Sequence, residues 1–208
     1  MRPRRLLKAG LVVAVLALWS ASSQAGIRGS DHDFSGQTWN PSGEICQPCH
    51  TPHGANTSVA DAPLWNHAVT QATFQPYQSS TIKATDLGQP SGRSKLCLSC
   101  HDGTVALDSF GGRTGTQYMP ADHTIGTNLR NDHPISFTYN DALAVVDRGL
   151  FSPSSKASGL GGTIQRDLLF NNKMECSSCH DVHNSLGIDN LLRKSNAGSA
   201  LCLTCHNK

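Results

Sequence analysis

The feature that most constrains this chain is a five-residue motif, Cys-x-x-Cys-His, which occurs four times and contains all eight cysteines. This spacing is the attachment signature of c-type haem. Its two thiols bond to the two vinyl groups of one haem, and the adjacent histidine becomes the proximal ligand of the iron. The four copies are Cys46-Gln-Pro-Cys49-His50, Cys97-Leu-Ser-Cys100-His101, Cys176-Ser-Ser-Cys179-His180 and Cys202-Leu-Thr-Cys205-His206.

Three other uses of paired cysteines compete with this interpretation. An even number of cysteines in an exported protein often forms disulfides, zinc ribbons use paired Cys-x-x-Cys, and a single Cys-x-x-Cys can be redox-active. None of these requires a histidine directly after every pair. We therefore expect four c-type haems (haem c, iron), attached through the eight cysteines and ligated on one side by His50, His101, His180 and His206.

The composition agrees with a fold built around haem. Aromatic residues make up only 6% of the 208 residues, whereas there are 19 glycines and 10 prolines. Such a chain has too little side-chain bulk for an ordinary core, and four flat apolar haems would replace it. The predicted class is mostly irregular with short α-helices and little sheet. We expect helices over 141–150 and 197–206, loops over 79–94 and 111–131, and a short strand near 137–139.

The N-terminus predicts export. Arg2, Arg4, Arg5 and Lys8 precede a short apolar run, Leu11 to Trp19, and small residues flank a cut before Gly26. This is the pattern of a secretory signal peptide over 1–25, and the run is about half the roughly 20 residues of a membrane span. Removing it takes four of the 17 Lys and Arg residues and none of the 15 Asp and Glu. The remaining domain, 26–208, then has a charge of −2, without a transmembrane segment or a basic patch for nucleic acid.

The four motifs alternate between two kinds. The first and third carry a second histidine three residues after the first, in His50-Thr-Pro-His53 and His180-Asp-Val-His183. The second and fourth share the context Leu-Cys-Leu-x-Cys-His. This alternation predicts duplication of a two-haem unit, with halves at about 26–130 and 131–208.

Each iron needs a second axial ligand, and six histidines remain to supply four. We expect bis-histidine ligation of all four haems, with Met119 and Met174 as the only other candidates. His53 and His183 are favoured because each is tied beside one haem and points towards a neighbouring one. The full set of expected distal ligands is His32, His53, His133 and His183, with His67 in reserve and His123 as the spare.

The strings around the motifs are more specific than the motifs themselves. They include Glu44-Ile-Cys-Gln-Pro-Cys-His-Thr-Pro-His53, Ala62-Pro-Leu-Trp-Asn-His67, Ser94 to Ala106, Asn131-Asp-His-Pro-Ile-Ser-Phe137 and Leu191 to His206. Over nearly all of 26–208 the chain resembles the extracellular multihaem cytochromes of metal-reducing bacteria. With four haems it is most similar to the tetrahaem OmcE type.

That resemblance implies a head-to-tail filament with one continuous haem chain, in which one haem of each subunit takes its distal histidine from the next. His53 would be that ligand. The implied function is extracellular electron transfer, with partner cytochromes and acceptors such as metal oxides, at the cell surface. A soluble periplasmic tetrahaem shuttle is the alternative. A multihaem reductase is less expected, because every motif ends in histidine and none leaves an iron open for substrate.

Overall fold

The computed structural model describes residues 26–208. The expected signal peptide, 1–25, lies outside the described residues. Within the described part of the chain, no helix combines the length and the apolar character needed to cross a membrane.

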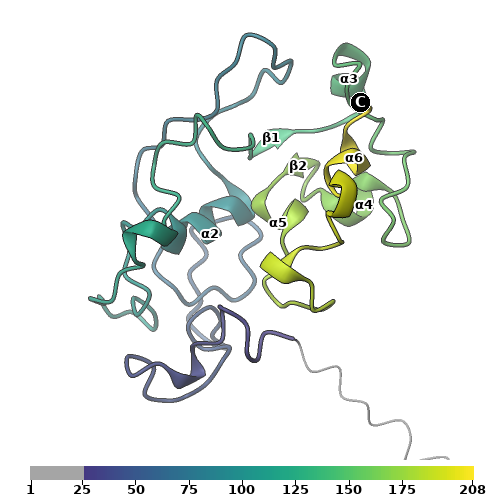
Figure 1. The fold of residues 1–208 in the computed structure, drawn as a ribbon. Coiled ribbons are helices and arrows are strands. Elements are labelled where there is room, and N and C mark those ends of the chain that lie inside the picture. The colour runs from purple at the N-terminus through teal and green to yellow at the C-terminus, as the bar shows by residue number, and fades with distance from the viewer. Residues whose placement is uncertain (1–25) are drawn as a thin grey trace, which may run out of the picture.

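Turns and loops make up most of the described chain, and its helices are short (Figure 1). The longest, α2 (Gly92–His101), carries the whole second motif in its second half, which ends at His101. The other α-helices are α3 (Asp141–Val146), α4 (Ile164–Leu168), α5 (Cys176–Cys179) and α6 (Cys202–Cys205). The 3-10 turns are η1 (Phe34–Gly36), η2 (Ala121–His123), η3 (Asp189–Leu191) and η4 (Ala197–Ser199). The predicted fold class, irregular with short helices and little sheet, is confirmed.

Two two-residue strands form the only named sheet of the described residues. β1 (Phe137–Thr138) runs antiparallel to β2 (Lys173–Met174), with Phe137 opposite Met174. Both residues are buried, and they belong to a cluster with Tyr139, Ile164, Leu168 and Leu169. The strand expected near 137–139 is therefore confirmed. Met174 lies in this apolar core, which leaves it unsuited to an iron ligand.

The helix expected over 141–150 begins where it is expected but is too long. The side chain of Asn140 accepts a hydrogen bond from the Leu143 amide (2.9 Å) and so caps α3, and the helix ends at Val146 and not at Leu150. The single helix expected over 197–206 is wrong. Gly198 and Ser199 have φ of 60° and 63°, which breaks the segment into η4 and α6.

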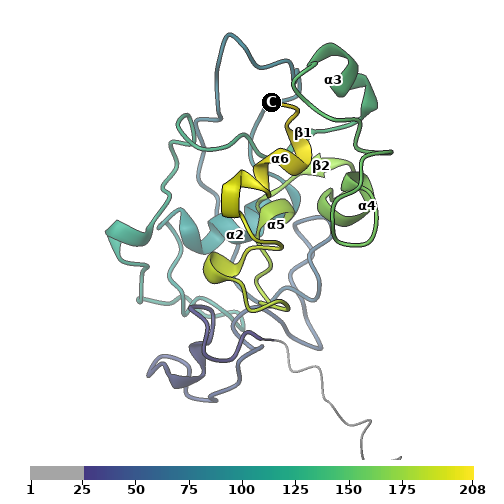
Figure 2. The ribbon, with the colours of Figure 1, turned by 45° about the vertical axis from the view of Figure 1, so that its right-hand side comes forward.

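The two halves of the chain meet where α2 packs against α5, and both views place the two helices next to one another (Figures 1 and 2). A buried carboxylate, Glu175, lies at this joint. It accepts hydrogen bonds from the amide of Ser94 (3.1 Å) and the hydroxyl of Ser136 (3.1 Å), and also from the Ser94 hydroxyl. The second motif, β1 and the third motif are thereby tied together.

Candidate haem-binding sites

Each motif contains a single helical turn that carries the first cysteine and the histidine. The amide of His50 donates to the carbonyl of Cys46 (2.8 Å), that of His180 to Cys176 (3.0 Å), and that of His206 to Cys202 (3.0 Å). In the second motif α2 runs through to His101. This turn brings the two thiols and the imidazole of each motif to one side of a short segment, which is the arrangement that a covalent haem requires.

A second backbone segment fixes three of the proximal histidines. His50 pairs with Trp65, His180 with Leu192 and His206 with Leu150 in isolated antiparallel bridges. The Nδ1 atom of His50 lies 2.6 Å from the carbonyl oxygen of Pro63, and that of His180 lies 2.9 Å from the carbonyl oxygen of Asn190. A carbonyl at Nδ1 orients the ring and leaves Nε2 for the metal.

The cysteines of successive motifs lie close enough to influence one another's pKa. Burial, with Cys49 close by, raises the pKa of the Cys100 thiol to about 12. The neighbouring Cys176 thiol, together with burial, raises the pKa of Cys97. Burial, with Cys179 close by, raises the pKa of Cys205 to about 12. The attachment points of the first and second motifs, the second and third, and the third and fourth are therefore neighbours.

Three proximal histidines face one of the expected distal histidines. The ring centroids are 6.2 Å apart for His50 and His183, 5.9 Å for His32 and His101, and 6.2 Å for His133 and His206. A metal–imidazole nitrogen bond is about 2 Å long, so two imidazoles bound on opposite sides of one iron have centroids roughly 6 Å apart. The three spacings therefore fit one iron each.

The environment of these rings suits metal ligands. Burial lowers the pKa of His32 to about 4, with a further contribution from His101, and burial also lowers the pKa of His101 and His206. The neutral imidazole is the form that binds iron. The buried Nδ1 of His32 and Nε1 of Trp65 have no hydrogen-bond partner in the described chain. All eight cysteines are free thiols, as addition to vinyl groups requires.

The third proximal histidine differs from the others, because His180 takes part in no ring pair of the described residues. It is exposed, and so is His53. His67 is buried, with Nδ1 2.8 Å from the carbonyl of Ala68 and Nε2 3.0 Å from that of Ala106. His123 is on the surface, with its side chain 73% exposed. The geometry thus groups His32, His133 and His183 with proximal histidines and leaves His53, His67 and His123 outside such pairs.

Sequence reasoning missed several residues that position these sites. The carbonyls of Pro63 and Asn190 give no sequence signal, because any residue supplies a carbonyl. Glu175 does have one, as an acidic residue directly before a haem motif. Trp65, whose ring meets that of His50 edge-on at 6.4 Å, lay within a string that the resemblance had already marked.

Comparison with known proteins agrees with this arrangement for one part of the chain. The family model described as "Doubled CXXCH motif" matches residues 170–208, which hold the third and fourth motifs. No curated protein sequence matches the chain. The doubled motif indicates covalent attachment of c-type haem and a multihaem c-type cytochrome, a class that typically carries electrons and is typically exported.

Proposed function

We propose that the chain carries electrons through four bis-histidine haems, one on each motif. Its axial pairs are His50 with His183, His101 with His32, and His206 with His133; the third haem has His180 on its proximal side. The three ring spacings of about 6 Å carry this proposal. Bis-histidine ligation gives lower reduction potentials than ligation by histidine and methionine, which suits anaerobic respiration.

The electrons pass along the haems in the order of the motifs. The thiols of successive motifs are near neighbours, Cys49 of Cys100, Cys97 of Cys176 and Cys179 of Cys205, which supports this path. In this scheme each iron has a histidine on both sides, with His53 supplied to the third haem, so no iron is reserved for a substrate. The protein is therefore an electron carrier and not a reductase, with partner cytochromes as donors and acceptors such as metal oxides.

The finer proposal is a filament at the cell surface, linked by His53. If haems simply follow chain order, the fourth haem of one subunit would receive His53 of the next. The pairing of His206 with His133 favours a different recipient, the third haem, whose His180 faces no other histidine of the described chain. His53 is exposed and available to a second copy. A head-to-tail contact of this kind does not close on itself and gives an open helical polymer.

A periplasmic shuttle is the second candidate, and one observation favours it. His183 reaches from the third motif to the proximal histidine of the first. His53 has the same spacing from its own motif, so it could make the reciprocal reach to the third haem of the same chain. A monomer would then contain all four distal ligands.

The test compares His53→Ala with the surface control His123→Ala in the mature, haem-loaded protein. Electron microscopy reports the assembly, and the absorption spectrum of the oxidised protein reports high-spin haem. The filament proposal expects polymers for the control, and monomers with one high-spin haem for His53→Ala. Wild-type monomers with four low-spin haems at high concentration would favour the shuttle. Four low-spin haems in monomeric His53→Ala would exclude His53 as a ligand in either form.

A further inference from the structure

Two arginines from different parts of the chain meet at one aromatic ring. The guanidinium carbon of Arg93, near the start of α2, lies 3.8 Å from the centroid of Phe170, and that of Arg193 lies 5.8 Å from it. Stacking on the ring accounts for the position of each side chain. It does not account for bringing two positive charges together, because like charges repel and their convergence calls for an anion nearby.

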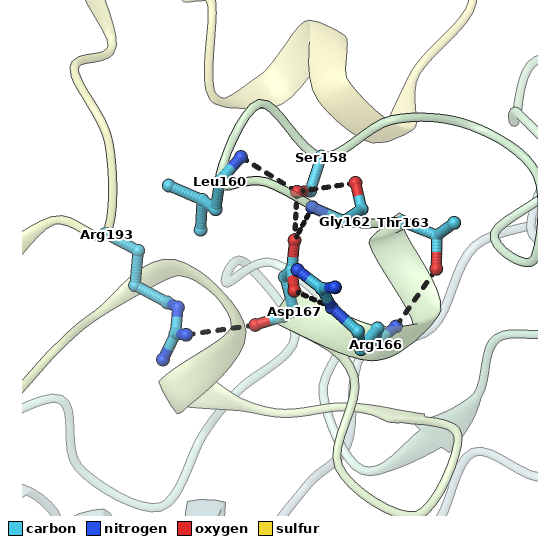
Figure 3. A network of polar contacts seen from close by, with 7 residues as sticks. All are labelled: Ser158, Leu160, Gly162, Thr163, Arg166, Asp167 and Arg193. Carbon is cyan, nitrogen blue, oxygen red and sulfur yellow. Dashed lines mark hydrogen bonds and ion pairs between the residues drawn. The ribbon is translucent and has the colours of Figure 1, made fainter.

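Neither arginine has such an anion within the described chain. No ion pair of residues 26–208 includes Arg93 or Arg193, and the Nε atom of each is buried without an acceptor. The side chain of Arg193 donates only to the backbone carbonyl of Asp167 (2.9 Å; Figure 3). A buried guanidinium N–H without an acceptor is costly. The ligand of this site should therefore be a negatively charged hydrogen-bond acceptor.

The one carboxylate close to Arg193 is already committed. Asp167 binds the Nε of Arg166 (2.7 Å), the amide of Gly162 (2.8 Å) and the hydroxyl of Ser158 (Figure 3). These three contacts fold the 158–162 loop onto α4 and direct both carboxylate oxygens away from Arg193. The positive charge of Arg193 is therefore not neutralised by Asp167.

The two arginines also lie beside two haem attachment points. Arg93 precedes Cys97 by four residues in α2, so the two side chains share a helix face. The amide of Arg193 donates to the carbonyl of Cys179 (2.9 Å). The pair is therefore placed where the second and third motifs meet.

We propose that Arg93 and Arg193 together bind one haem propionate at the boundary between the second and third haems. Haem brings two carboxylates, and the planar guanidinium, with its fork of donors, matches a carboxylate in geometry and charge. The proposal rests on haem attachment and is independent of filament assembly. Positive charge beside a haem favours its reduced form, because reduction adds a negative charge. Both arginines thus raise the reduction potential of the haem whose propionate they hold.

The test uses the mature, haem-loaded protein with Arg93→Gln, Arg193→Gln and the double variant. Arg113→Gln is the matched control, since Arg113 also stacks on a phenylalanine (Phe110, 4.4 Å) but donates to the carbonyls of Asp108 and Trp39. Optical redox titration should show one haem with a lowered midpoint potential in each single variant. The double variant should shift by less than the sum, because both arginines share one carboxylate.

Intact mass separates the possible failures. Wild-type protein that lacks the second or third haem would refute haem attachment itself. Four haems, with titration curves of Arg93→Gln and Arg193→Gln that match Arg113→Gln, would overturn the propionate site. If Arg93→Gln fails to mature, Arg93→Lys replaces it, because lysine keeps the positive charge without the planar guanidinium. The midpoint potential of the affected haem should then stay close to that of the wild type. A wild-type-like propionate proton resonance in that variant would count against direct contact.

Discussion

The first and third motifs are built alike and yet place their second histidines differently. In both, a helical turn carries cysteine to histidine, an extended segment bridges to the histidine, and a carbonyl lies at its Nδ1. The ring of His183, after the third motif, lies 6.2 Å from that of His50 between centroids, at an interplanar angle of 18°. His53, at the same spacing after the first motif, faces no histidine of the described chain. Local sequence thus sets local geometry, whereas the partner of the second histidine depends on which segment lies opposite.

The residue before each motif adds a second difference. Ile45 precedes the first motif, which lies in turns, whereas Glu175 precedes the third and caps α5. In this capping box the Glu175 amide donates to the hydroxyl oxygen of Ser178 (2.9 Å), while the Glu175 carboxylate accepts from Ser94 and Ser136. The third motif is consequently anchored to α2, whereas the first is held by Pro63, Trp65 and Asn66. The third should matter more to the stability of the whole domain.

The largest expected effect is loss of a haem. Replacing both cysteines of the first motif, or both of the third, by alanine should remove one haem from the intact mass, and Ser177→Ala should remove none. The third-motif variant should also be digested faster by trypsin, because it loosens the contact between α5 and α2. Equal digestion rates of the two variants would contradict the stronger anchoring of the third motif. Fewer than four haems on the wild type would contradict the proposed haem count.

The next effect concerns the coordination of one iron. His183→Ala should convert the first haem from low-spin to high-spin at any protein concentration, because its ligand comes from the same chain, and the reduced protein should then bind carbon monoxide. His53→Ala should do this for the third haem. In the filament proposal, wild type diluted to monomers should resemble His53→Ala. A low-spin first haem in His183→Ala would show that the 6.2 Å pair does not ligate iron.

Features decided by a few neighbouring residues could be predicted from the sequence. The motif spacing identifies the thiols and proximal histidines without a structure, because attachment is decided within five residues. Low aromatic content and abundant Gly and Pro predict an irregular fold for the same local reason. The capping of α3 by Asn140 and the strand at Phe137 were also readable. The break at Gly198 and Ser199 was missed although Gly198 is a signal for it, because glycine readily adopts positive φ and weakens a helix.

Which distal histidine pairs with which proximal one depends on tertiary structure. The sequence could therefore rank candidate ligands but could not assign their partners. His32, His133 and His183 were expected among the ligands, but nothing in their neighbours states that His183 faces His50 or that His133 faces His206. The distinctive contexts of His32 and His133 place them among the expected ligands, and His67 is the reserve. Its two contacts with carbonyls of residues 68 and 106 come from chain folding and leave no periodic signal. The same holds for the meeting of Arg93 and Arg193.

A smaller effect, on stability and without change in coordination, is expected at Glu175. Glu175→Ala leaves the hydroxyls of Ser94 and Ser136 without their acceptor and should lower the free energy of unfolding by about 2 to 4 kcal/mol. The exposed control Glu44→Ala should change little. Chemical denaturation followed by circular dichroism would measure both. A loss no larger than that of the control would contradict the anchoring of the third motif.

The same carboxyl should also make stability depend on pH. Burial raises the pKa of Glu175 above its ordinary 4.5, so the folded state binds more protons than the unfolded state above pH 4.5. Its contribution to the free energy of unfolding therefore falls as pH rises through that window. Glu175→Gln, which cannot ionise, should flatten this part of the curve relative to wild type. An unchanged slope would mean that Glu175 is already ionised in the folded protein.

The smallest effect is expected at His67, and it decides what completes the third haem. His67→Gln removes an imidazole whose two nitrogens lie beside backbone carbonyls, so the free energy of unfolding should fall by about 1 kcal/mol while all haems stay low-spin. The exposed His123→Gln should change neither quantity. The two variants are compared by denaturation and by the absorption spectrum of the oxidised protein. If His67→Gln instead gains one high-spin haem, then His67 rather than His53 is the ligand opposite His180. The first and third motifs would then differ because His53 has no role in ligation, and the filament proposal would lose its link.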